Sequence, residues 1–192
     1  MTSEDPAQEA RRRGNAARAA GDYLQALNAL DDAVLLSPGD IAGWHDRGAL
    51  MLEMDEPVQA LRDFEAGLVL APRDARLLSG RAAAFLALAN YDAALAAADL
   101  AAATQPQVPG LHELRALALH GLEQLDAAIV EQRLAVADSP MDGRCRYNLG
   151  RLLEEAGRLE EASDSYLVAI TLAPDCEAAA QARVRVNARL RP

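Results

Sequence analysis

The chain has 192 residues, of which 51% are hydrophobic and 4% aromatic, and its formal net charge is -10. A chain this acidic lacks the extended basic surface that nucleic acid requires, and no apolar run approaches the ~20 residues needed to cross a bilayer. The start, Met1 to Pro6, has neither the basic n-region nor the apolar core of a secretory leader. We therefore predict a soluble, cytoplasmic protein with no nucleic acid and no membrane among its partners.

A period of 34 residues organises the chain. Proline takes the same place in five successive periods, at Pro38, Pro72, Pro106, Pro140 and Pro174. One column is alanine throughout, at Ala26, Ala60, Ala94, Ala128 and Ala162. Two more columns hold only glycine or alanine, at Gly14, Gly48, Ala82, Ala116 and Gly150 and at Ala33, Gly67, Ala101, Ala135 and Ala169. Since small residues let helices approach closely and proline cannot continue a helix, the period predicts stacked antiparallel helical hairpins.

The predicted elements follow this period in chain order. Each repeat should hold a first helix, a short turn, a second helix and a link that contains proline. The repeats cover about residues 7–40, 41–74, 75–108, 109–142 and 143–176. The turns are expected at Gly21-Asp22, Asp55-Glu56, Ala89-Asn90, Glu123-Gln124 and Gly157-Arg158. Because the register is unbroken, we predict a single domain over residues 1–192.

The link after the third repeat, Gln105 to Gly110, differs from the others. It lacks a closing aspartate and so offers no obvious N-cap, and Pro109 is expected in the first turn of the next helix. We expect a looser joint there. The fourth repeat also has Gln132 in the column where the second has Phe64, so its packing should be the least secure.

A final helix is predicted over about residues 177–190. Its arginines make one side polar, and Val184, Val186 and Leu190 are expected to cover the last hairpin. A stack of repeats needs such a capping helix because its terminal repeat would otherwise expose a core face.

The second repeat carries a specific combination of residues, namely Trp44, Gly48, Ala60, Phe64, Gly67 and Pro72. With the matching columns of the other repeats, it resembles the tetratricopeptide repeat (TPR) family over about residues 7–176. The resemblance implies an all-α fold, a right-handed superhelical α-solenoid of five stacked helix-turn-helix repeats plus a C-terminal capping helix. It also implies that the first helices line a concave groove that binds another protein.

Applied to this chain, the resemblance gives a set of candidate peptide-binding residues. They are Arg11, Asn15 and Arg76 towards the N-terminus, Leu52, Leu86 and Leu117 in the middle, and Arg144, Tyr147, Asn148 and Arg151 towards the C-terminus. An apolar middle with arginine-rich ends suits a peptide or helix with hydrophobic residues and an acidic group near a terminus. We favour the C-terminal end, where four polar side chains share about one helical face.

One TPR subgroup binds the C-terminal carboxylate of heat-shock chaperones through a clamp of five basic and asparagine side chains. Arg11, Asn15 and Arg76 lie at three of its positions, and Asp46 and Gly80 lie at the other two. A carboxylate at Asp46 would repel the ligand and Gly80 offers no side chain, so a solvated groove rim is favoured over a working clamp.

A second arginine column, Arg13, Arg47, Arg81 and Arg115, repeats with the hairpins. It could read an anionic polymer, but we favour a structural role in which the side-chain stems pack on the hairpin. The guanidinium groups are expected to meet acids such as Asp31, Glu65 and Asp99.

Catalysis has little support in the sequence. It contains no glycine-rich phosphate loop, no serine elbow and no Cys/His pair at metal-ligand spacing, so we predict no enzyme, no cofactor and no metal site. Cys145 and Cys176 are expected to be small apolar fillers. Besides a protein-binding adaptor, two alternatives stay open: a self-associating structural module that forms a homo-oligomer, and a regulatory module that works with a separate enzyme.

Overall fold

A computed structural model describes residues 5–191, so the predicted absence of a leader falls partly on residues outside the described part. Within it, all regular secondary structure is helical. The helices are α1 (Pro6–Ala19), α2 (Tyr23–Leu36), α3 (Ile41–Glu53), α4 (Pro57–Leu70), α5 (Ala75–Ala87), α6 (Tyr91–Thr104), α7 (Leu111–Gly121), α8 (Leu125–Asp138), α9 (Gly143–Glu155), α10 (Leu159–Leu172) and α11 (Glu177–Leu190). The predicted all-α architecture of helical hairpins with a final helix is confirmed.

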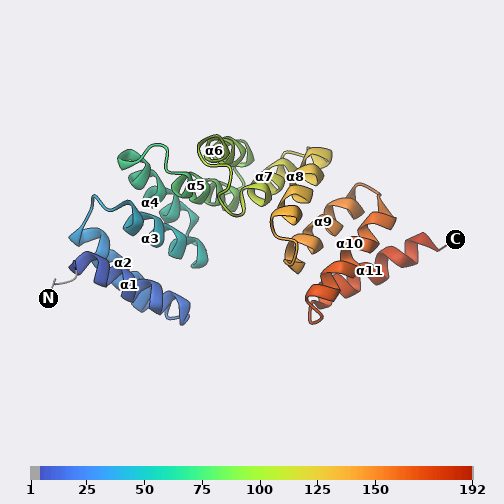
Figure 1. The fold of residues 1–192 in the computed structure, drawn as a ribbon, viewed down its shortest axis with the longest axis horizontal. Coiled ribbons are helices and arrows are strands. Elements are labelled where there is room, and N and C mark those ends of the chain that lie inside the picture. Colours follow the sequence, from blue (N-terminus) through green and yellow to red (C-terminus); the bar gives the residue numbers. More distant parts are fainter. Residues whose placement is uncertain (1–4, 192) are drawn as a thin grey trace. The chain divides into compact units, whose positions relative to one another are not determined.

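The helices form two compact units, Met1–Val108 and Pro109–Pro192. The first holds the hairpins α1–α2, α3–α4 and α5–α6, and the second holds α7–α8, α9–α10 and α11 (Figure 1). Within each unit the second helix of one hairpin packs on the first helix of the next. The boundary between the units lies in the link Gln105 to Gly110, for which the sequence predicts a looser joint. The single domain over 1–192 stays a prediction.

The small-residue columns lie where the two helices of each hairpin cross. All five residues of the alanine column are fully buried. A Cβ atom placed on Gly48 would lie 2.9 Å from the Phe64 ring, and one on Gly150 would lie 2.6 Å from the Tyr166 ring. In the second and fifth hairpins, the large ring of the second helix therefore fills the space that the small residue of the first helix leaves, as the columns predicted.

Most helices begin at a side chain that caps a free backbone N–H. The capping oxygens belong to Asp5, Asp22, Asp40, Asp74, Asn90 and Asp142. Helix α7 has no side-chain cap, which is also true of α4, α8, α10 and α11, and it differs from them in that its N-cap is Gly110 at φ 80°. The prediction of an uncapped start is thus confirmed, but that of Pro109 in the first turn is wrong, since α7 begins at Leu111. Gly110, whose backbone is in the left-handed region, lies between Pro109 and the first residue of α7.

Every hairpin turns through one residue in the left-handed region. These residues are Gly21 (φ 78°), Asp55 (φ 60°), Ala89 (φ 54°), Glu123 (φ 61°) and Gly157 (φ 73°). In each turn the N–H of the next residue donates to the carbonyl five positions earlier, as Asn90 does to Phe85 at 2.9 Å. This is the Schellman motif, which ends a helix and satisfies its last carbonyls.

Replacing Ala89 by glycine should stabilise the protein. A Cβ at φ 54° strains the backbone, and glycine removes that strain, so we expect a gain of about 0.5–1 kcal/mol in the free energy of unfolding. Urea denaturation followed by circular dichroism measures it. The reverse change, Gly157→Ala, is the matched control and should destabilise by a similar amount. If both variants unfold at the parent's midpoint, the turns carry no strain.

The fourth hairpin replaces aromatic packing with hydrogen bonds. Gln132 is 1% exposed, and its amide donates to the Cys145 carbonyl at 3.0 Å. Burial raises the pKa of the Cys145 thiol to about 11, which fits an apolar filler rather than a reactive thiol. Beside them, His112 Nδ1 lies 2.7 Å from Glu131 Oε2.

Helix α11 covers the last hairpin through Ala179, Ala182 and Val186, all buried. The expectation that Val184 also covers the hairpin is wrong, because Val184 is 70% exposed. Two residues advance a helix by about 200°, so Val184 faces away when Val186 faces α10. Leu190 is half-buried.

The arginine column has a structural role at Arg47. Its guanidinium donates twice to Asp63, at 2.8 and 2.7 Å, and once to the predicted Asp31, at 2.8 Å. Its charge also lies 5.1 Å from the centre of the Trp44 ring. Arg115 of the same column pairs with Glu131 at 3.0 Å, an acid that was not among those predicted.

Candidate functional site

The first helices of the hairpins present one side of each unit, which we call the first-helix face. It comprises α1, α3 and α5 in the first unit and α7 and α9 in the second. All ten candidate residues belong to these helices. The polar candidates differ in whether their side-chain groups already have partners within the chain.

In the first unit the candidate polar residues converge on an internal carboxylate. Asp46 accepts hydrogen bonds from Arg11 at 3.3 Å and Asn15 at 2.7 Å, and it lies 3.1 Å from His45 Nδ1. Burial alone would raise the pKa of this carboxyl, but its three partners outweigh burial and hold the pKa below its usual value. An anionic ligand here would have to displace a hydrogen-bonded carboxylate.

The other first-unit candidates are also engaged or partly covered. Arg76 pairs with Asp74, the cap of its own helix, at 3.2 Å. Leu52 and Leu86 are half-buried. A Cβ on Gly80 would lie 2.3 Å from the Phe64 ring, so packing explains why this position of the clamp has no side chain.

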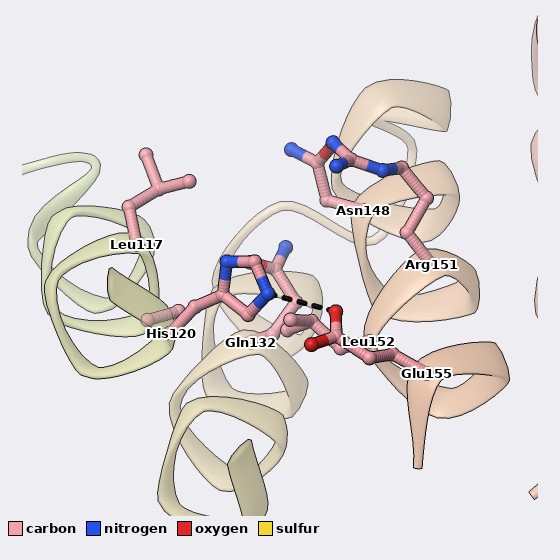
Figure 2. Close-up of a pocket in the computed structure, with 8 residues that line it drawn as sticks. Leu117, His120, Gln132, Asn148, Arg151, Leu152 and Glu155 are labelled. Carbon is pink, nitrogen blue, oxygen red and sulfur yellow. Dashed lines mark hydrogen bonds and ion pairs between the residues drawn. The ribbon is translucent and has the colours of Figure 1, made fainter. Parts of the chain in front are cut away.

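The second unit has a hollow of ≈ 60 Å³ on its first-helix face, between α7 and α9 (Figure 2). The residues that line it are Ala116, Leu117, His120, Gln132, Asn148, Arg151, Leu152 and Glu155. Its wall is partly apolar, with Leu117 44% exposed at one side. His120 Nε2 and Glu155 Oε2 lie 2.8 Å apart across the hollow, as the dashed line in Figure 2 shows.

Two of the four favoured C-terminal residues share an internal partner. Arg144 donates to both oxygens of Glu113, the Nη2–Oε2 bond being 2.9 Å, and Asn148 donates to the same carboxylate at 3.2 Å. The hydrogen bond to Glu113 raises the pKa of Arg144 above its ordinary value. Glu113 therefore neutralises Arg144 in the second unit, much as Asp46 does Arg11 in the first.

The other two residues differ from this pair. Within residues 5–191 the guanidinium of Arg151 makes no hydrogen bond or ion pair, and its side chain is exposed at the rim of the hollow. Tyr147 instead packs against the Tyr166 ring, with centroids 5.8 Å apart. Tyr166 donates to Glu154 at 2.9 Å, and burial and that carboxylate raise the pKa of its phenol.

The two units carry different side chains at equivalent repeat positions. Three periods separate Asn15 from Leu117 and Ala49 from Arg151. In the first unit the corresponding cleft is lined by Asn15, Arg18, Ala19, Asp46 and Glu53. There Arg18 donates twice to Glu53, at 3.0 and 2.6 Å. Both clefts thus hold an internal pair at this position, Arg18 with Glu53 and His120 with Glu155, but only the second exposes a leucine beside an arginine that has no partner among residues 5–191.

The structure brings Leu117, Asn148 and Arg151 together at one hollow, and it shows five lining residues that were not among the binding candidates from the sequence. These are Ala116, His120, Gln132, Leu152 and Glu155. The spacing could have predicted the contact between His120 and Glu155, since these residues have the same separation and repeat register as Arg18 and Glu53.

Two further findings concern chemistry and membranes. In the described part of the chain, no group of three or more His, Cys, Asp or Glu residues is placed to hold a metal ion. Of the helices between residues 5 and 191, none has the length and apolar character that a bilayer crossing requires.

Comparison with known proteins identifies the fold. Residues 114–175 match the family model described as tetratricopeptide repeat. No curated protein matches the chain. TTC0263, a thermophilic TPR protein of Thermus thermophilus, is 25% identical at a TM-score of 0.78, covering 96% of this chain and 98% of its own.

Two other solved structures share the fold. MamA (41-end) from Desulfovibrio magneticus RS-1 is 21% identical at a TM-score of 0.74, covering 90% of this chain and 97% of its own. YrrB, described as a TPR protein with an unusual peptide-binding site, is 18% identical at a TM-score of 0.68, covering 94% of this chain and 93% of its own. Together with the repeat register and the observed hairpins, these matches show that the chain has the tetratricopeptide repeat fold, with the family model itself matched over residues 114–175.

Proposed function

We propose that the chain is a non-catalytic adaptor that holds a peptide or helix of a partner protein on the first-helix face of its second unit. The observation that carries the proposal is the hollow between α7 and α9, where exposed Leu117 lies at the same site as the unpaired Arg151. Apolar area gives binding energy and a guanidinium fixes the orientation of an acidic group.

One comparison supports this choice of site, and a second supports peptide binding in general. In the first unit, the guanidinium groups of Arg11 and Arg18 are already paired with internal carboxylates, so that cleft offers a ligand no counterpart of Arg151. YrrB, which has the same fold, is described as having a peptide-binding site. The proposed site rests on the contrast between the two units, and the description of YrrB adds support for peptide binding.

The double charge reversal Arg144→Glu with Arg151→Glu should weaken capture of the native partner by more than ~1 kcal/mol, the usual threshold for an interface residue that matters. Most of the loss should come from Arg151→Glu, because Glu113 already neutralises Arg144. Calorimetry with the partner retrieved by the parent chain measures it, and circular dichroism checks that helicity is kept. Arg62→Glu, at an exposed arginine of α4, is the matched control. Undiminished capture by the double variant would rule out this site.

Concentration dependence separates the adaptor from the self-associating module. An adaptor keeps one mass in sedimentation over a wide concentration range, whereas a homo-oligomer dissociates on dilution. Activity assays of a retrieved partner would reveal a module that regulates a separate enzyme. The cytoplasmic location stays a prediction from the sequence.

A further inference from the structure

The size and wall of the hollow restrict what can enter it. Its ≈ 60 Å³ is less than half of the ~150 Å³ that holds a benzene ring. Ala116 and Leu152 are buried beneath it and Leu117 borders it. The hollow therefore cannot enclose an aromatic or long aliphatic side chain, and the group it fits best is a small aliphatic one such as that of alanine or valine.

The charges around the hollow favour one carboxylate. Arg151 and Asn148 are three residues apart on α9 and project from the same side of the helix (Figure 2). Asn148 gives one amide N–H to Glu113, which leaves its second N–H for a ligand. A guanidinium and an amide N–H together match the two oxygens of a carboxylate.

The neighbouring acids set the limit on ligand charge. Glu113 is held by Arg144 and Asn148, and Glu155 is held by His120. Glu155 lines the hollow together with Arg151, and Glu113 contacts Asn148 beside it, so repulsion from these two carboxylates disfavours a dianion such as a phosphate group. A single negative charge on a flexible stem meets these conditions.

We infer that the hollow takes a small aliphatic side chain of the partner while the carboxylate of an adjacent Asp or Glu side chain binds Arg151 and Asn148. The inference rests on the proposed function, in which a segment of the partner runs along the first-helix face. Such a segment presents its carboxylates on side chains rather than at a chain end. The chemistry recognised is thus an acidic residue next to alanine or valine.

Selection from a display library tests the inference without a known partner. The library should present random 12-residue peptides whose C-terminus is fused to the carrier, so that only side-chain carboxylates are available. Peptides that bind the full chain are expected to be enriched in Asp or Glu next to Ala or Val. The preference should disappear with the double variant Leu117→Asn and Arg151→Ala, which gives the second unit the residues of the first at those positions.

A double-mutant cycle on one selected peptide identifies the contact. Changing its acid to the amide, or changing Arg151→Gln in the protein, should each weaken binding about tenfold, and the two together should do little more. Arg62→Gln, at an exposed arginine of α4, should bind as the parent does. Circular dichroism must show that each variant keeps its helicity.

The outcomes distinguish the two proposals. If the parent enriches no peptide and retrieves no partner, the proposed function fails and this inference with it. If enriched peptides depend on Leu117 but carry aromatic residues or no acid, the function stands and the inference is overturned. The inference is also overturned if Arg144→Gln abolishes the preference for acids while Arg151→Gln leaves it intact.

Discussion

Truncation of the chain after Cys176 is expected to lower the free energy of unfolding by about 3 kcal/mol or more and to cause association. Helix α11 buries three of its own residues and shields α10, in which Ala162, Tyr166 and Ala169 are fully or almost fully buried. Its removal exposes a continuous apolar face and forfeits the transfer free energy of those side chains. It also removes Arg185, which donates to Glu154 at 2.9 and 2.8 Å.

A pair of point variants tests the same idea without shortening the chain. Val186→Asp places a charge at a fully buried position, whereas Val184→Asp places it on the opposite side of the helix, where the side chain is 70% exposed. The first should cost about 3 kcal/mol and the second less than about 0.5 kcal/mol. Urea denaturation and sedimentation measure stability and association. A truncated chain that melts with the parent would show that α11 does not protect the last hairpin.

The second large effect is expected from a single added methyl group. Gly80→Ala should destabilise by about 1–3 kcal/mol, although alanine is the better helix former. Its Cβ would lie 2.3 Å from a ring atom of Phe64, which is 1% exposed and is also in close contact with Gly48. Either the ring leaves its preferred rotamer or α5 shifts away from α4, and both disturb the interface between the second and third hairpins.

Gly39→Ala provides the control for that substitution. A Cβ at Gly39 would meet no atom within 4 Å, and its backbone is outside the left-handed region. The variant is expected to unfold within about 0.5 kcal/mol of the parent, with any change in the stabilising direction. Thermal melts of the two alanine variants compare the same chemical change in crowded and open surroundings. Equal melting temperatures would mean that the Phe64 ring accommodates the methyl group.

The fold could be predicted from the sequence because its causes repeat. A small residue marks the crossing in all five hairpins, and this five-fold repetition is visible without coordinates. In some hairpins a large residue stands opposite it, as Phe64 does to Gly48 and Tyr166 to Gly150. Positions that depart from the repeat were harder to interpret. Gln132 indicated weak packing, yet its amide finds the Cys145 carbonyl, and such a bond depends on a rotamer that the column does not encode.

The candidate site was only partly predictable for a related reason. The repeat register placed Arg144 and Arg151 on the same helix face. It did not show that Glu113 binds Arg144, or that Arg151 has no partner in the described part of the chain. Nor did it show that the Tyr147 ring turns towards Tyr166. Long side chains choose among several acids within reach, and that choice depends on distances between neighbouring hairpins.

The outward position of Val184 bears on attempts to lengthen this protein by design. In a sixth hairpin, α11 would be the first helix, and the added second helix would have to cross it at Val184. The first helices of the other hairpins carry only glycine or alanine at this position. Even the bare Cβ of an alanine at Gly150 would lie 2.6 Å from the Tyr166 ring, so a β-branched side chain at that crossing would hold the added helix off. An engineer who wishes to append repeats should first convert Val184 to glycine, and a terminus that is to stay closed to further stacking should keep it.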